Sequence, residues 1–270
     1  MEELKAYYES WDEDARLASR HGQVEFLTTM HFIDRYLRPG MRVLEIGAGT
    51  GRYSHALAQR GYEVDAVELI AHNIDVFRQK TQHGERVTIR QSNAPDLADF
   101  ADGSYDVTLL LGPMYHLHTE GEQKRALQEA LRVTRRGGVL FAAYCGNDAT
   151  MFQCGFGQGD ILREPYRSLI DPVTFKAAST PGTLFHLYRK EDVDALMAGF
   201  PVKRLHYAAV DLNVCYLADA IDRMDDALFA QYMRYNLFLC ERPDMVGLAS
   251  HILDVSRKEG RHQNQGSSCE

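Results

Sequence analysis

The glycine-rich stretch at residues 43–51 constrains this chain more than any other part of its sequence. It begins with the aliphatic run Val43–Ile46, which is typical of a buried parallel strand. Gly47, Gly49 and Gly51 follow and predict a sharp turn, because glycine tolerates positive φ and lets the backbone approach a ligand. The helix expected after this turn would present unpaired N–H groups to a carboxylate or phosphate.

An acidic residue follows the next predicted strand. Residues 63–67 alternate as a strand does, and Glu68 comes about 20 residues after the first glycine, where an acid accepts ribose hydroxyls. Strand, glycine turn, helix, strand and acid form a general nucleotide-binding unit, which by itself does not name the nucleotide. Arg52 stands where a dinucleotide fingerprint has its third glycine, which argues against a nicotinamide-dependent oxidoreductase.

The octapeptide at 44–51 resembles motif I of the class I S-adenosylmethionine (SAM)-dependent methyltransferases, with Glu45 two residues before the first glycine. Tyr105-Asp106-Val107 resembles a second family signature, and residues 135–140 resemble a third with Arg136 replacing proline. The resemblance covers residues 42–144. It implies an α/β fold, with a Rossmann-like, seven-stranded, mostly parallel sheet, helices on both faces and an α-helical cap or insertion.

The resemblance also implies a SAM site, with S-adenosylhomocysteine (SAH) as the product. Asn93 and Ala94 take the positions that meet the adenine ring, although Asn93 could instead only start the turn before Pro95. Tyr8 and Arg16 are candidates for binding the methionine carboxylate; the alternative for this aromatic segment is core packing. The full set of cofactor candidates is Glu45, Gly47, Ala48, Gly49, Gly51, Glu68, Leu69, Asn93, Ala94, Leu111, Tyr8 and Arg16.

The loop at 112–118 follows a hydrophobic strand and should border the reacting methyl group, because ligands bind beyond the carboxyl ends of parallel strands. A hydroxyl acceptor needs a base, and His116 is the first catalytic candidate, followed by His118. Tyr115 and Tyr144 are expected to line the pocket. The alternative is that these histidines only shape the pocket. His186 and His251 are weaker candidates.

The chain divides into segments of different pattern. We expect an N-terminal helical lid at 1–41 and a SAM-binding core at 42–210, in which 145–189 forms an insertion on the substrate side. A helical cap over the active site is expected at 211–247, a last strand at 248–258, and a disordered tail at 259–270.

Charge and composition limit the partners. The net charge of −8 disfavours nucleic acid, and no run of residues is apolar enough to span a membrane. The acidic N-terminus and the five unpaired cysteines predict a cytoplasmic protein. No histidine spacing indicates a metal site. A monomer or a homodimer is expected.

The sequence therefore predicts an enzyme that transfers a methyl group from SAM to a small organic acceptor. An O, N or C nucleophile would react by in-line displacement and release SAH. The alternatives are an RNA or protein methyltransferase and a SAM-binding protein without catalysis.

Overall fold

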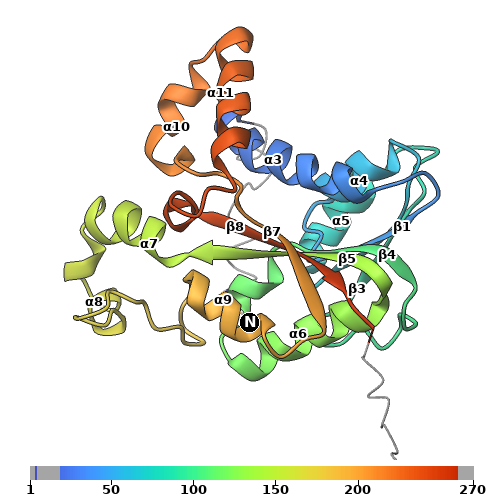
Figure 1. The fold of residues 1–270 in the computed structure, drawn as a ribbon, viewed down its shortest axis with the longest axis horizontal. Helices are drawn as coiled ribbons and strands as arrows, with labels where there is room; N and C mark the ends of the chain where they lie inside the picture. Colours follow the sequence, from blue (N-terminus) through green and yellow to red (C-terminus); the bar gives the residue numbers. More distant parts are fainter. Residues whose placement is uncertain (1–3, 5–18, 261–270) are drawn as a thin grey trace, which may run out of the picture.

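A twisted sheet runs through the centre of the molecule, with helices above and below it (Figure 1). The computed structural model describes Leu4 and residues 19–260. Seven strands lie in the order β3-β2-β1-β4-β5-β8-β7. Their bounds are β1 Arg42–Ile46, β2 Glu63–Glu68, β3 Val87–Gln91, β4 Tyr105–Leu110, β5 Thr134–Gly146, β7 Val202–Ala209 and β8 His251–Lys258.

The predicted fold class is confirmed, with one addition. Strands β1 to β5 pair in parallel, and only β8 runs antiparallel, against both β5 and β7. An eighth strand, β6 (Leu187–Tyr188), pairs with the end of β5. The sequence does not reveal this two-residue strand, because it is too short to show a period. Its Tyr188 hydroxyl donates to the Met114 carbonyl at 2.9 Å and ties β6 to the loop after β4.

Helices cover both faces of the sheet, which explains why the central strands are almost continuously apolar. On one face lie α3 (Arg20–Tyr36) and α4 (Arg52–Ala58); on the other lie α6 (Glu120–Val133) and α9 (Lys190–Met197) (Figure 1). Helix α5 (Ala71–Lys80) buries Phe77 against Ala48 and Ala66.

Strand β5 follows helix α6 without a connecting loop. Helix α6 ends at Val133, and β5 starts at Thr134. Tyr105 pairs with Thr134 and Val107 pairs with Val139, so residues 135–138 form a bulge in β5. The side chain of Asp106 accepts a hydrogen bond from Arg135 and compensates for the disturbed ladder.

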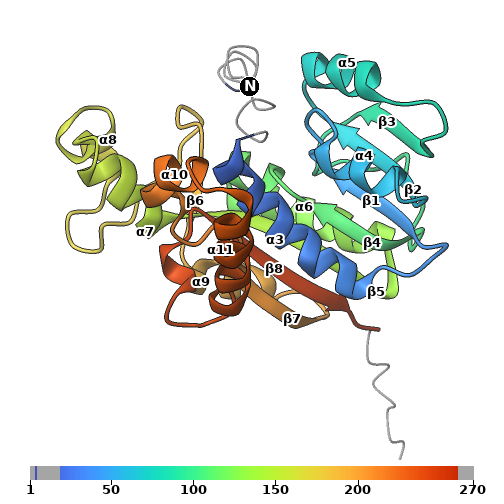
Figure 2. The same cartoon turned by 90° about the horizontal axis from the view of Figure 1, so that it is seen from above.

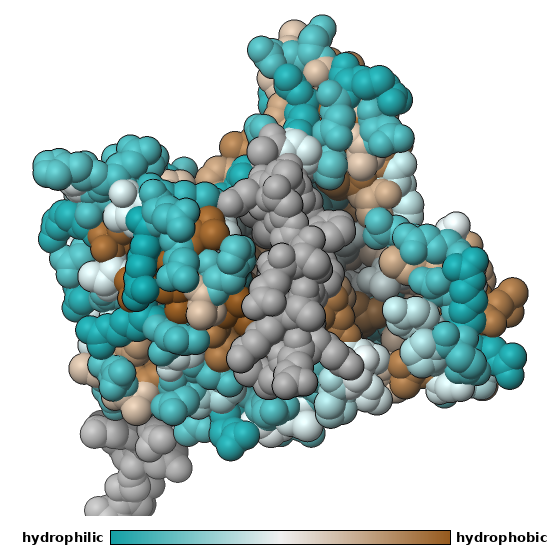
Figure 3. Space-filling model, turned by 180° about the vertical axis from the view of Figure 1, so that it is seen from behind, coloured by the Kyte–Doolittle hydropathy of each residue, from teal (hydrophilic) through white to brown (hydrophobic). Residues whose placement is uncertain are grey.

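The segment after β5 consists of short helical pieces and extends beyond the sheet (Figure 2). It contains α7 (Asn147–Thr150), a wide helical turn at Met151–Phe156, a 3₁₀ turn at Asp160–Leu162 and α8 (Tyr166–Leu169). Several of its apolar side chains reach the surface, as Figure 3 shows on this side of the molecule. They are Phe152, Phe156, Leu162, Tyr166, Val173 and Phe175.

Two helices between β7 and β8 form a separate layer, as the sequence predicts. Helices α10 (Val214–Asp222) and α11 (Asp226–Leu239) pack on α3. Asn236 of α11 donates to Thr28 of α3 at 2.9 Å in a buried contact. Within residues 19–260 and Leu4, no helix has the length and apolar character of a membrane span.

Candidate functional site

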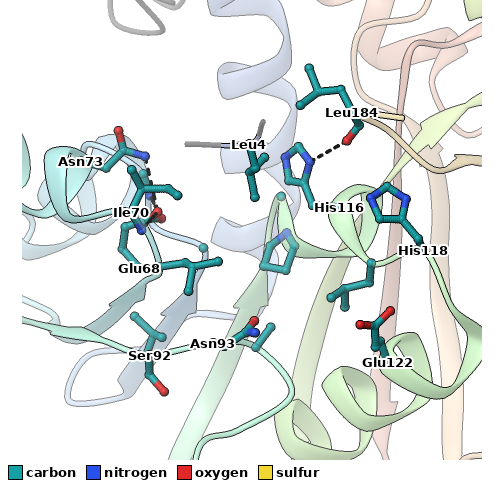
Figure 4. A pocket seen from close by; sticks show the side chains of 18 of the residues that line it. Leu4, Glu68, Ile70, Asn73, Ser92, Asn93, His116, His118, Glu122 and Leu184 are labelled. Atoms are coloured by element: carbon teal, nitrogen blue, oxygen red, sulfur yellow. Dashed lines mark hydrogen bonds between the residues drawn. The ribbon is translucent and has the colours of Figure 1, made fainter. Parts of the chain in front are cut away.

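A cavity of about 320 Å³ opens where four parallel strands end. Because the carboxyl ends of these strands meet at one edge of the sheet, the residues that follow β1, β2, β3 and β4 converge there. Most of the predicted cofactor and catalytic residues line this cavity. They are Gly47, Gly49, Glu68, Leu69, Asn93, Ala94, His116 and His118. Leu4, Asn73 and Leu184 line it as well (Figure 4).

The glycine loop adopts the backbone conformation that the sequence predicts. Gly47, Gly49 and Gly51 have φ values of 79°, 54° and 93°, which residues with a Cβ rarely adopt. A Cβ on Gly47 would lie 2.5 Å from Cδ of Pro113, so this glycine also allows two loops to pack together. A Cβ on Gly49 would meet no atom within 4 Å, because this residue faces the open cavity.

Glu68 is the anchored acid of the cavity. Its carboxylate accepts hydrogen bonds from the Gly49 amide at 2.8 Å, the Ile70 amide at 2.9 Å and the Asn73 side chain at 3.4 Å. It is 6% exposed, and the remaining exposure is to the cavity (Figure 4). Ile70 and Asn73, which follow β2, supply two of these donors. No sequence motif marks Asn73 as a partner of Glu68.

Asn93 and Ala94 lie in a tight turn after β3. The Asn93 carbonyl accepts the Asp96 amide at 2.9 Å, so Asn93 does start a turn, as the alternative interpretation holds. Both residues nevertheless line the cavity, and Figure 4 shows the Asn93 side chain there. The turn therefore leaves the Asn93 side chain available to a ligand.

His116 lies in the 3₁₀ turn Pro113–His116 after β4. Its Nδ1 lies 3.0 Å from the Leu184 carbonyl, which can only accept, so Nδ1 carries the proton and Nε2 the lone pair. Burial lowers the pKa of His116 to about 4, because the imidazolium would lose its hydration. His116 is therefore a neutral imidazole at pH 7. His118, farther along the loop, hydrogen-bonds to the Ser179 hydroxyl at 2.7 Å.

Glu45 lies away from the cavity. It is 1% exposed and accepts a hydrogen bond from the Ser54 hydroxyl beneath the glycine loop. Burial raises the pKa of Glu45 to about 8, against the lowering effect of Ser54. The Glu45 side chain thus contacts Ser54 inside the protein, and its contact with the cofactor stays a prediction.

Three further cofactor candidates do not line the cavity. Ala48 is buried and donates its amide to the Val67 carbonyl at 3.0 Å. Gly51 packs against His55 and Phe77, and Leu111 packs against the core. Tyr8 and Arg16 lie outside the described residues.

A second cavity of about 530 Å³ lies beside the first, and Thr183 and Leu184 line both. Tyr115 lines this second cavity, as predicted for a residue near the acceptor. Tyr144 does not: it is fully buried and packs against Tyr188, with ring centroids 4.9 Å apart. The rest of the wall comes mainly from residues 145–187 and from the start of β8.

No residue of the helical cap at 211–247 lines either cavity, which differs from the expected position over the active site. Val214 and Ile221 of α10 and Phe229 of α11 pack instead against Val24 of α3. His21 of α3 pairs with Asp222 at 2.7 Å. Tyr216 of the cap makes a ring contact with Phe152, the neighbour of the wall residues Met151 and Gln153.

His251 is a site residue whose surroundings the sequence does not predict. It lines the second cavity and pairs with Asp211, with Nδ1 to Oδ2 at 2.8 Å. The two residues are 40 positions apart and belong to opposite ends of the cap insertion. No local motif joins them, so only the folded chain reveals the pair.

Comparison with known proteins agrees with this architecture. Residues 44–142 match a family described as "Methyltransferase domain". The chain is 37% identical to a demethylmenaquinone methyltransferase from Clavibacter sepedonicus, over 58% of this chain and 59% of that protein. It is 24% identical to a ubiquinone biosynthesis O-methyltransferase from Hahella chejuensis, over 80% of this chain and 91% of that protein. The chain spans about half the length of the demethylmenaquinone methyltransferases that it matches.

A solved structure with similar topology is the magnesium protoporphyrin IX methyltransferase from Synechocystis PCC 6803, which contains bound SAH. The TM-score is 0.59 at 14% sequence identity, and the match covers 96% of this chain and 99% of that chain. At this identity the similarity establishes the fold.

Proposed function

We propose that this chain is a class I SAM-dependent methyltransferase that transfers the methyl group of SAM to a small organic acceptor. The first cavity is the proposed cofactor site, and the second cavity is the proposed acceptor site. Both meet at Thr183 and Leu184, so a donor in one cavity can face an acceptor in the other.

The carboxylate of Glu68 is the observation that carries the proposal. It lies at the carboxyl end of β2, holds its orientation through three donors, and lines the cavity with its remaining surface. Each carboxylate oxygen accepts more than one hydrogen bond, so the two ribose hydroxyls of SAM can add to the existing donors. The open space at Gly49 fits a ligand that approaches the backbone.

The remaining proposed cofactor contacts come from residues at the same edge of the sheet. The side-chain carbonyl of Asn93 would accept from the adenine amino group, and the Ala94 amide would meet a ring nitrogen. The sulfonium end would then point toward the loop at 112–116 and the second cavity.

The reaction needs alignment more than activation. SAM supplies an activated methyl group on a positively charged sulfur. The acceptor forms a bond to this methyl group while the carbon–sulfur bond breaks, and its electron pair stays on the sulfur of SAH. The protein's contribution is to hold donor and acceptor in line and to exclude water.

The prediction that His116 is a general base stays a prediction. Its neutral state at pH 7 permits proton removal, but a pKa of about 4 gives that transfer little driving force. Pocket shaping by His116, which fixes Leu184 between the two cavities, is the alternative.

A small acceptor is favoured by the second cavity, whose volume and largely apolar wall suit an organic molecule. Two of the relatives named above are a demethylmenaquinone methyltransferase and a ubiquinone biosynthesis O-methyltransferase, which supports the same substrate class. The net charge of −8 disfavours an RNA acceptor. An RNA or protein methyltransferase and a SAM-binding protein without catalysis remain the alternatives.

Calorimetric titration with SAM and SAH, with NAD as a control ligand, tests the cofactor assignment. Wild type should bind SAM and SAH but not NAD, and Glu68→Ala should abolish binding. Glu63→Ala is the matched control, since Glu63 begins the same strand at the opposite edge. Binding of NAD alone would overturn the proposal.

Methyl transfer is then measured with isotopically labelled SAM and a panel of small phenols, amines and thiols. Label transfer to one class identifies the acceptor atom. Tight SAM binding with no transfer to the panel or to protein and RNA would favour the non-catalytic alternative.

A further inference from the structure

His251 lies at the ligand-binding edge of the sheet because of the direction of β8. This strand runs antiparallel to β5, so its first residue pairs with Cys145 near the end of β5. His251 and Cys145 both line the second cavity, and the rings of His251 and Tyr115 are 6.1 Å apart. A residue that begins β8 therefore shares a wall with the loop expected to border the reacting methyl group.

Asp211 fixes the orientation of this histidine. One carboxylate oxygen accepts the His251 amide at 2.9 Å, and the other pairs with Nδ1 at 2.8 Å. Glu25 of α3 lies 3.7 Å from the same Nδ1. Neither acid lines the cavity, and both lie beside the Nδ1 edge of the ring. The exposed part of His251 faces the cavity.

The charges around the ring favour its protonated form. Burial by itself would lower the pKa of His251, but the charges of Glu25 and Asp211, and the hydrogen bonds that the ring makes to Asp211 and Cys145, raise that pKa well above its usual value. No lysine or arginine is among the described residues of the cavity wall. The other charged group there is Asp160, which pairs with Arg163 at 3.4 Å. Tyr115, Cys145, Cys154 and Tyr166 are the remaining titratable groups of the wall.

We propose, on the premise of the methyl transfer proposed above, that His251 binds the ionised oxygen of the acceptor in the second cavity. The acceptor class is then an acidic hydroxyl compound, a phenol or an enol, and the enzyme is an O-methyltransferase. Asp211 acts as a positioning residue, because it touches His251 and not the cavity.

The step balances without a further reactant. The acceptor loses its proton to solvent when it binds as the anion beside the imidazolium. The oxygen then forms a bond to the methyl carbon, the carbon–sulfur bond breaks, and the negative oxygen and positive sulfonium become a neutral ether and a neutral thioether. No base is needed at the moment of transfer. A protonated amine would be repelled by the imidazolium.

The test uses 4-nitrophenol as the probe, because its phenolate has a distinct visible absorption. The full-length protein is titrated with the probe, in the presence of SAH, for wild type and His251→Gln. The nearly isosteric 4-nitroaniline is the uncharged control ligand. Wild type should lower the apparent pKa of bound 4-nitrophenol, and His251→Gln should weaken binding of the phenolate by about tenfold or more. Affinity for 4-nitroaniline should change by less than about threefold, since the cavity keeps its shape.

Asp211→Asn provides a second, independent variant. It leaves the His251 amide with an acceptor but removes one negative charge beside Nδ1. Phenolate binding depends on the imidazolium and is lost as the pH rises through the pKa of His251. Asp211→Asn should move this loss to lower pH, which a merely structural role of Asp211 would not do.

Equal ionisation of the bound probe in wild type and His251→Gln would overturn the inference, and so would failure of wild type to bind the phenolate more tightly than the variant does. SAH affinity separates this failure from that of the proposed function. Phenolate binding without any SAM or SAH binding would refute methyl transfer, whereas SAH binding with unselective probe binding would refute only the role of His251.

Discussion

His116 in the first cavity faces a neutral carbonyl, whereas His251 in the second cavity faces two carboxylates. Both side chains are largely removed from water, which by itself lowers the pKa of a histidine. The hydrogen bond to the Leu184 carbonyl offsets only a small part of this burial effect, so the pKa of His116 falls to about 4. Asp211 and Glu25 raise the pKa of His251 in spite of its burial. The comparison shows that burial sets the direction of the pKa shift when the partner is a neutral carbonyl, and that two nearby carboxylates outweigh burial.

The two cavities also differ in what builds them. The first is made of strand ends and of backbone groups in a fixed turn, such as the amide of Gly49 that holds Glu68. The second is made of side chains from an irregular segment and from β8. Substitutions that disturb the backbone should therefore damage the first cavity far more than the second.

The largest effect is expected from alanine in place of glycine. Gly47→Ala would bring a Cβ to 2.5 Å from Pro113 at a φ of 79°, and we expect the free energy of unfolding to fall by about 3 kcal/mol. Gly155→Ala in the second cavity meets the flexible end of Met151 at 2.9 Å and should cost less than about 1 kcal/mol. Urea denaturation measures both. Similar losses in the two variants would contradict the proposed difference.

Substitution of the two acids near the glycine loop should change SAH affinity by very different amounts. Glu68→Gln should weaken SAH binding about 30-fold, through the loss of charged hydrogen bonds to the ribose. Glu45→Gln should change SAH affinity less than about threefold, because Glu45 faces Ser54 and not the cavity. Calorimetry with SAH measures both affinities. A comparable loss in Glu45→Gln would restore Glu45 as a direct cofactor contact.

The pH dependence of stability should separate the histidines. The folded-state pKa of His116 is lowered to about 4, so its contribution is present above the ordinary value of 6.5 and is lost as the pH falls toward 4. His251 has a raised pKa, so its contribution is present below 6.5 and is lost as the pH rises through the raised value.

His116→Gln should therefore reduce the loss of stability in acid by about 1–2 kcal/mol, and His251→Gln should reduce the loss in alkali. Burial also lowers the pKa of His186 to about 4, so the His116→Gln variant should still lose some stability in acid. Urea denaturation midpoints across the pH range measure how each variant changes the pH dependence of stability. If both variants reduced the loss of stability at the same end of the pH range, the proposed difference between the two histidines would be contradicted.

The smallest effect is expected from the wall of the second cavity. Leu169→Ala removes an apolar contact from α8 and should weaken binding of 4-nitrophenol by about threefold, from the lost apolar area. SAH affinity should stay within about twofold and the free energy of unfolding within about 0.5 kcal/mol. A larger loss of SAH affinity would show that the two cavities do not act independently.

The sequence by itself determines the cofactor half of the protein. Gly47, Gly49 and Glu68 follow strands that are recognisable from their apolar runs, and parallel strands bring their carboxyl ends together whatever the rest of the chain does. The positive φ values of the glycines and the place of Asn93 follow from the same local rules. The β5 start at Thr134 is an exception, because a bulge has no clear sequence pattern.

Only the tertiary structure decides the acceptor half. Asp211 and His251 are separated by the whole helical cap, and they meet because β8 returns antiparallel to β5 and β7. The charge on His251 depends in addition on Glu25, which α3 brings from a third region. Electrostatic partners across such distances leave no period or motif in the sequence. The sequence therefore offers His251 only as a weaker candidate, and the fold supplies its two carboxylate partners.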